Sequence, residues 1–136
     1  MAENQSIKEY TKAMKAVYTI LFLTGSNIFM TLAWYGHLKF KDLSLFRHTG
    51  FWATILISWG FAFFEYCLQV PGNRIGFQGN GGPFNLMELK ILQEVISLSV
   101  FTVFMLLVFK NEPMQWNHFA AFICIILAVY FVFYNK

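Results

Sequence analysis

The sequence has few charged residues: Asp, Glu, Lys and Arg make up 12% of the chain, against about 25% in an average soluble protein. Hydrophobic residues make up 57%, and aromatic residues alone 20%. A chain of this composition cannot cover a folded surface with polar side chains, which excludes an ordinary water-soluble domain. The composition therefore indicates an integral membrane protein.

Cysteine is also scarce. Cys67 and Cys124 lie in separate apolar segments, and their spacing matches no metal or redox motif. We therefore expect no metal site and no cofactor, and we interpret both cysteines as small packing residues. The net charge of +3 favours contact with anionic lipid rather than with nucleic acid, which we do not expect as a partner.

Long apolar runs fill most of the chain. A helix needs roughly 20 residues to cross a hydrocarbon core of about 30 Å. Runs of this length cover residues 16–35, 51–70, 90–109 and 115–134. Because backbone groups in lipid must be paired within the protein, all four are predicted to be helices. The first run is too long for a signal peptide, so we expect it to be retained. The sequence predicts an all-α bundle of four transmembrane helices, with residues 1–136 forming one domain in the lipid bilayer.

Proline and glycine are concentrated between the second and third runs. The segment PGNRIGFQGNGGPFN, residues 71–85, holds five of the nine glycines and two of the three prolines, so we expect a loop. It lacks the Gly-Lys-Ser/Thr ending of a phosphate-binding loop. Asn85 and Glu88 have the spacing of a capping box, which predicts that the third helix begins near Leu86.

The basic residues give only a slight orientation signal. One side of the membrane carries Lys8, Lys12, Lys15, Arg74, Lys90 and Lys136, and the other carries Lys39, Lys41, Arg47 and Lys110. The positive-inside rule then predicts that both termini are cytoplasmic. Since the difference is small, insertion in both orientations with antiparallel pairing stays open as an alternative.

Polar residues form stripes at helical spacing within the apolar runs. The stripe of the second run consists of Thr54, Ser58, Ala62, Glu65 and Gln69. That of the first run consists of Thr24, Asn27, Thr31 and Trp34, and that of the third of Lys90, Glu94 and Ser97, with Gln93 adjacent. The fourth run has no such stripe but places Ala120, Cys124 and Ala128 at steps of four, which allows close helix contact. We interpret these three residues as a dimer face or, alternatively, as packing within the chain.

Two of the acidic residues lie inside the predicted membrane core. At 1.5 Å per residue, Glu65 is roughly 8 Å and Glu94 about 6 Å from the end of its span. A carboxylate there costs about 2 to 3 kcal/mol unless it is paired, protonated or hydrated. In one interpretation Glu65 binds a proton or cation with the support of Glu94, and the path is lined by Asn27, Ser58, Trp34 and Gln69. In the other, Lys90 and Arg74 pair with the two acids in a structural network.

Three segments carry a family resemblance: MTLAWYGHLKFK at 30–41, SWGFAFFEYCLQVPGNRIGF at 58–77 and LKILQEVISLSVF at 89–101. Over residues 16–135 the chain resembles a small bacterial four-span family of the drug/metabolite transporter superfamily. The resemblance implies a bacterial inner-membrane protein and, by analogy with small multidrug-resistance exporters, an antiparallel homodimer that moves organic solutes against protons. Those exporters have an essential acid in the first span, whereas this chain has Asn27 and no acid there.

These observations predict a small proton-coupled transporter of an amphipathic or cationic metabolite that acts as a dimer. The alternative is a non-transporting membrane scaffold or lipid-binding subunit. We do not expect an enzyme, because no nucleophile, base and orienting group can be placed together from the sequence.

Overall fold

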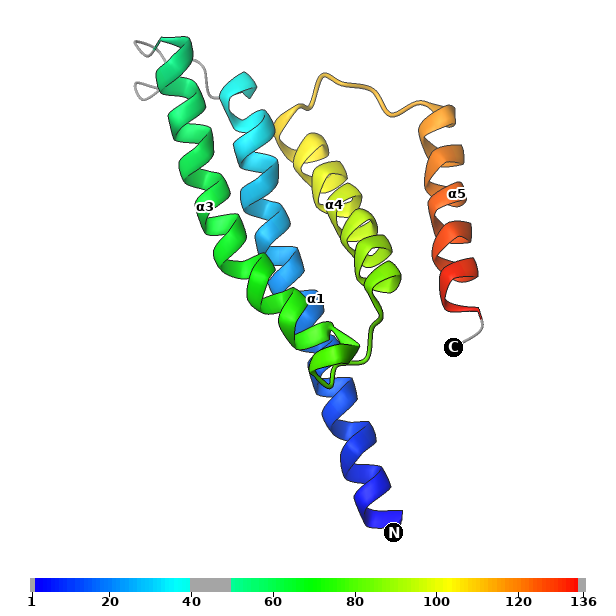
Figure 1. The fold of residues 1–136 in the computed structure, drawn as a ribbon. Helices are drawn as coiled ribbons and strands as arrows, with labels where there is room; N and C mark the ends of the chain where they lie inside the picture. Colours follow the sequence, from blue (N-terminus) through cyan, green and yellow to red (C-terminus); the bar gives the residue numbers. More distant parts are fainter. Residues whose placement is uncertain (1, 40–49, 135–136) are drawn as a thin grey trace.

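The computed structural model describes residues 2–39 and 50–134, which form four long helices and one short 3₁₀ turn (Figure 1). The elements are α1 (Ala2–Lys39), α3 (Phe51–Gly76), η2 (Gln78–Asn80), α4 (Leu86–Val108) and α5 (Trp116–Phe133). Each of the four helices is long and apolar enough to cross a membrane. The predicted all-α bundle of four membrane-crossing helices is confirmed. Lys41, Arg47 and Lys136, which entered the charge count, lie outside the described residues.

Helices α1 and α3 run antiparallel and form the most extensive contact of the bundle. Helix α4 packs on α1, and α5 stands beside α4 at the edge of the bundle (Figure 1). None of the residues 116–133 that form α5 is buried. The bundle therefore has a tight α1–α3 core to which α4 and then α5 are added.

Helix α1 is much longer than the membrane is thick. Its 38 residues span about 57 Å at 1.5 Å per residue. The Lys15 Nζ donates a hydrogen bond to the Gly81 carbonyl, so Lys15 lies level with the α3–α4 loop. Residues 2–14 continue beyond that loop as a helical N-terminal extension (Figure 1). The predicted span at 16–35 is the part of α1 that lies within the bundle.

Three glycines let α1 and α3 approach closely. A Cβ atom placed on Gly72 would lie 2.9 Å from the Phe22 Cβ, and one on Gly76 would lie 2.7 Å from the Thr19 Oγ1. Such distances are shorter than side-chain carbon contacts allow. Gly25 faces α3, where its Cβ would lie 3.1 Å from a methyl group of Leu68. We call Gly25, Gly72 and Gly76 the glycine seam.

The prediction that residues 71–85 form a loop is wrong for the first six of them. Helix α3 continues through Pro71 and ends at Gly76, so the loop covers only residues 77–85. Proline removes one helical hydrogen-bond donor. Here, however, Gly72 and Gly76 are buried against α1, and this packing holds the segment in the helix.

The start of α4 is as predicted. Asn85 is the N-cap, its side chain accepts a hydrogen bond from the backbone N–H of Glu88 at 2.8 Å, and the Glu88 carboxylate accepts one from the Asn85 N–H at 3.1 Å. This reciprocal pair satisfies donors that a helix start leaves unpaired. It fixes the residue at which α4 begins after the loop.

The buried side chains of the bundle are largely polar. The fully buried set consists of Thr19, Leu23, Ser26, Asn27 and Glu65. Large aromatic and aliphatic side chains lie outside, as in Trp59, Phe63 and Leu107. This inversion suits a bundle whose outer surface contacts lipid, and it places the chemically active groups between the helices.

Candidate functional site

Glu65 lies inside the α1–α3 interface. Its side chain has a relative exposure of 0%. The pairing of Gly25 with Leu68 and the stacking of Phe29 on Phe64, with ring centroids 5.6 Å apart, set the antiparallel register. In this register Glu65 is level with the turn of α1 that contains Ser26 and Asn27, both of which are also buried.

Glu65 differs from the other fully buried polar side chains in having no hydrogen-bond partner among the described residues. The Ser26 hydroxyl donates to the Leu23 carbonyl at 3.0 Å, and Thr31 donates to the Asn27 carbonyl at 2.8 Å, so α1 satisfies its own hydroxyls. Neither carboxylate oxygen of Glu65 has a hydrogen-bond partner within residues 2–39 and 50–134. An ionised carboxylate without a partner costs several kcal/mol in an apolar site.

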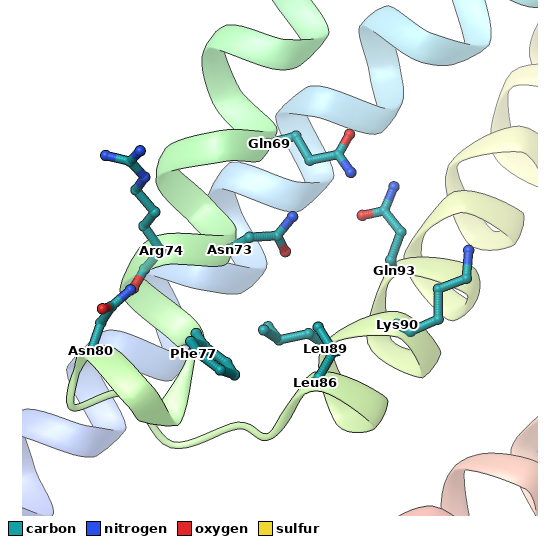
Figure 2. Close-up of a pocket in the computed structure, with 9 residues that line it drawn as sticks. All are labelled: Gln69, Asn73, Arg74, Phe77, Asn80, Leu86, Leu89, Lys90 and Gln93. Atoms are coloured by element: carbon teal, nitrogen blue, oxygen red, sulfur yellow. The ribbon is translucent and has the colours of Figure 1, made fainter.

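Lys90 and Arg74, which the sequence offered as partners of the two acids, do not pair with Glu65. Lys90 forms an ion pair with Glu94, one turn along α4, and both side chains are more than half exposed. Arg74 is exposed and forms no ion pair within the described part of the chain, and Figure 2 shows its side chain directed away from Gln69 and Gln93. The described residues therefore supply no counter-ion to Glu65.

A hydrogen bond between Asn27 and Gln93 joins α1 to α4. The Gln93 Nε2 donates to the Asn27 Oδ1 at 3.2 Å, and the Asn27 Nδ2 donates to the Leu23 carbonyl at 2.7 Å. The Gln93 Oε1 is buried and has no partner among the described residues. A buried acceptor left unpaired costs about 1 to 3 kcal/mol. This oxygen and the two of Glu65 are therefore acceptors in need of a donor.

A cavity of about 380 Å³ lies between the end of α3 and the start of α4 (Figure 2). It is lined by Gln69, Asn73, Arg74, Phe77, Asn80, Leu86, Leu89, Lys90 and Gln93. The amide side chains of Gln69 and Gln93 extend toward each other from the two helices, and Phe77 and Leu89 form an apolar floor (Figure 2). We call this the α3–α4 cavity.

Glu65 does not line the α3–α4 cavity. It precedes Gln69 by four residues, which places it one helical turn, about 6 Å, beyond the inner end of the cavity. The carboxylate is therefore adjacent to the cavity but closed off from it.

Two predicted site residues share a different cavity. Trp34 and Glu94 line a space of about 240 Å³ between α1 and α4, together with Thr31, Tyr35, Ser97, Leu98 and Phe101. Ser58 is half-buried on the Glu65 face of α3, nearly two turns away from Glu65. The structure thus places Gln69 one turn from Glu65 and joins Asn27 to Gln93. Glu94 and Trp34 line a different cavity from the one that Gln69 and Gln93 line.

Sequence reasoning missed Asn73, Phe77 and Asn80 as cavity residues. Asn73 continues the series Glu65, Gln69 at the same step of four, so the helical pattern predicts it once α3 is extended beyond Pro71. Phe77 and Asn80 belong to the loop, where no periodicity places a side chain. The predicted dimer face, Ala120, Cys124 and Ala128, is exposed on α5.

Most of the chain matches a model of a known protein family. A family model described as "Putative member of DMT superfamily (DUF486)" matches residues 19–133, which include Glu65, the glycine seam and the α3–α4 cavity. No curated protein and no solved structure matches the chain. With four apolar helices and a match over most of its length, the chain belongs to this family of transporter-like, multi-pass membrane proteins in the drug/metabolite transporter superfamily.

Proposed function

We propose that the protein is a small proton-coupled secondary transporter of an amphipathic cation and that it works as a homodimer. The observation that carries the proposal is the fully buried Glu65, which has no partner among the described residues and lies one helical turn beyond the inner end of the α3–α4 cavity. Intramembrane acids of this kind usually mark ion or substrate paths. Membership in a transporter superfamily supports the same class of function.

The unpaired oxygens at and beyond the inner end of the cavity support a cation that carries N–H donors. Of the two basic residues that line the cavity, Lys90 is paired with Glu94, and Arg74 points away from Gln69 and Gln93 (Figure 2). Glu65 and Gln93 offer acceptor oxygens without donors, and a bound ammonium or guanidinium group would satisfy them. Phe77 and Leu89 would contact the apolar part of the substrate. Glu65 holds either a proton or the substrate cation. Because the two compete for the same carboxylate, transport of the cation in one direction is coupled to transport of a proton in the other. In this proposal Asn27 positions Gln93, and Ser58, Trp34 and Glu94 line the rest of the path.

The proposed setting is the bacterial inner membrane, with both termini cytoplasmic. The proposed dimer contact is Ala120, Cys124 and Ala128 on α5, because all three are exposed and small residues permit close helix packing. Antiparallel pairing of two chains remains the alternative arrangement. The proposal assigns no catalysis and no cofactor to the chain.

Proton release on ligand binding tests the proposal. Purified protein in weakly buffered detergent is titrated with octylguanidinium, which keeps its own proton at neutral pH, while a pH indicator reports released protons. We expect up to one proton per bound ion from the native chain and none from the Glu65→Gln variant. Glu112→Gln, a matched change at an exposed acid in the α4–α5 connection, should behave as the native chain. Equal proton release from Glu65→Gln would exclude Glu65 as the coupling acid.

A tetraalkylammonium ion of similar size separates charge from hydrogen bonding. It carries the same charge but no N–H group, so we expect weaker binding than for octylguanidinium. Equal binding of the two ions would contradict the role of the unpaired oxygens.

A non-transporting scaffold or lipid-binding subunit is the second candidate. It is favoured by one observation: Glu65 is closed off from the cavity rather than lining it. Under this candidate the polar interior serves to hold the helices together. No proton release with any ligand, combined with a loss of stability in Glu65→Gln, would support it.

A further inference from the structure

A second, basic cleft lies on the loop side of the bundle. It has a volume of about 470 Å³ and is lined by Lys15 of α1, by Arg74 and Ile75 at the end of α3, and by Asn80 of η2. It therefore joins α1 to the consecutive elements α3 and η2, which lie about 60 residues farther along the chain. Arg74 contributes to this cleft as well as to the α3–α4 cavity, and in Figure 2 its guanidinium group points away from the latter.

Two hydrogen bonds tie the walls of the basic cleft together. The Lys15 Nζ donates to the Gly81 carbonyl at 3.2 Å, and the Asn80 Nδ2 donates to the Arg74 carbonyl at 3.2 Å. Gly81 has a φ of +82°, a left-handed conformation that suits glycine. The loop conformation thus holds the ammonium group of Lys15 at the cleft without neutralising its charge.

No carboxylate in the described part of the chain balances the charges in the cleft. Neither Lys15 nor Arg74 forms an ion pair with any described carboxylate, whereas Lys90, the next basic residue on this side, is paired with Glu94. Two cations lining one cleft repel each other, and an anion between them removes that repulsion. The planar guanidinium group of arginine suits phosphate oxygens, to which it donates two parallel hydrogen bonds.

The depth of the cleft matches that of lipid headgroups. The apolar run of α3 ends at Val70, and Arg74 lies four residues farther on, about 6 Å along the helix. The headgroup layer extends roughly 5 to 8 Å beyond the hydrocarbon core on each side. A phosphate group held between Lys15 and Arg74 would therefore lie at the level of the phospholipid phosphates.

We propose that this basic cleft binds the phosphate group of an anionic phospholipid. Lys15 and Arg74 contact the phosphate oxygens, and the Asn80 amide borders the same site. The N-terminal extension adds Lys8 and Lys12, at steps of four and three toward Lys15, as a more distant source of attraction. The site shares Arg74 and Asn80 with the lining of the α3–α4 cavity, but it does not rest on the transport proposal.

Titration of the detergent-purified protein with dioleoylphosphatidylglycerol or dioleoylphosphatidylcholine, followed by native mass spectrometry, tests the site. We expect phosphatidylglycerol to bind more tightly, and the double variant Lys15→Gln, Arg74→Gln to bind it about tenfold or more weakly, as the loss of charge-assisted hydrogen bonds predicts. Glutamine keeps an N–H donor for the Gly81 carbonyl. Arg74→Gln alone, which leaves that contact untouched, should show part of the loss.

The matched control is Lys8→Gln, Lys12→Gln, which removes the same charge from the same end of the molecule but outside the cleft. We expect this control to retain most of the native affinity. If it weakens phosphatidylglycerol binding as much as the cleft variant does, attraction is diffuse and the cleft is not a site. Equal binding of both lipids by the native chain would overturn the proposal in the same way.

Competition identifies the source of the phosphate. Inorganic phosphate and glycerol 3-phosphate carry the same group without acyl chains, so neither should displace bound phosphatidylglycerol. Displacement by either compound would retain the phosphate chemistry of the cleft but overturn its assignment to a lipid.

Discussion

The close contact of α1 with α3 can be tested by adding one methyl group at two positions of the same helix. Gly76 is buried, and a Cβ atom there would lie 2.7 Å from the Oγ1 and 2.8 Å from the Cγ2 of Thr19, and 3.1 Å from a methyl carbon of Leu89. Gly60 lies in the middle of α3 with nothing within 4 Å of its Cβ position. Gly76→Ala and Gly60→Ala are therefore the same chemical change in crowded and open surroundings.

The expected effects have opposite signs. Alanine is favoured over glycine within a helix by about 1 kcal/mol, so Gly60→Ala should be neutral or stabilising by up to that amount. Overpacking of a close contact costs about 1 to 3 kcal/mol. Thr19 offers little relief, because it is β-branched and its hydroxyl donates to the Lys15 carbonyl at 2.7 Å. We expect the two variants to differ by about 1 to 4 kcal/mol in free energy of unfolding.

Unfolding by SDS in mixed micelles, followed by the loss of helical circular dichroism, measures this difference. Gly72→Ala, whose Cβ would lie 2.9 Å from the Phe22 Cβ, should behave like Gly76→Ala. If the free energies of unfolding of Gly76→Ala and Gly60→Ala agree, α1 and α3 do not pack through the glycine seam. The register that buries Glu65 would then be wrong as well.

Three further variants test local contacts in the same unfolding titration. Asn85→Ala removes the N-cap of α4 and should lower the free energy of unfolding by about 1 kcal/mol. Gln93→Leu removes the donor to Asn27, at a cost of about 0.5 to 1 kcal/mol, but it also removes the unpaired Gln93 Oε1, whose burial costs at least as much, so we expect no net loss of stability. Lys90→Gln should have no measurable effect, because its ion pair with Glu94 is exposed and such pairs contribute little.

The helices follow from the sequence because their causes are local. Run length and hydropathy locate all four, and the Asn85–Glu88 capping box fixes the start of α4. The end of α3 does not follow, because Pro71 is a helix breaker by its own chemistry. Packing against α1, which buries Gly72 and Gly76, favours the helix here. A prediction made from neighbouring residues cannot take account of contacts with α1, which lies about 50 residues earlier in the sequence.

For the candidate site too, features within one helix could be predicted from the sequence, and contacts between helices could not. Periodicity identifies the α3 face that carries Glu65 and Gln69, because that pattern lies within one helix. The rotation of α4 does not follow from its own pattern: Gln93 bonds to Asn27, while its neighbour Glu94 is exposed and pairs with Lys90. Likewise, the burial of Glu65 depends on the register that the glycine seam sets between α1 and α3.

The stability of Glu65→Gln distinguishes the two candidate functions independently of any ligand. The scaffold candidate requires Glu65 to join the helices through an ion pair, and breaking a buried ion pair costs about 3 to 5 kcal/mol. Glu65 has no such partner among the described residues, so an uncharged side chain of the same shape removes a burial cost and breaks no contact. We therefore expect Glu65→Gln to unfold at the same or a higher SDS fraction than the native chain. A loss of about 3 kcal/mol would contradict this reasoning and reveal a partner for Glu65, as the scaffold candidate requires.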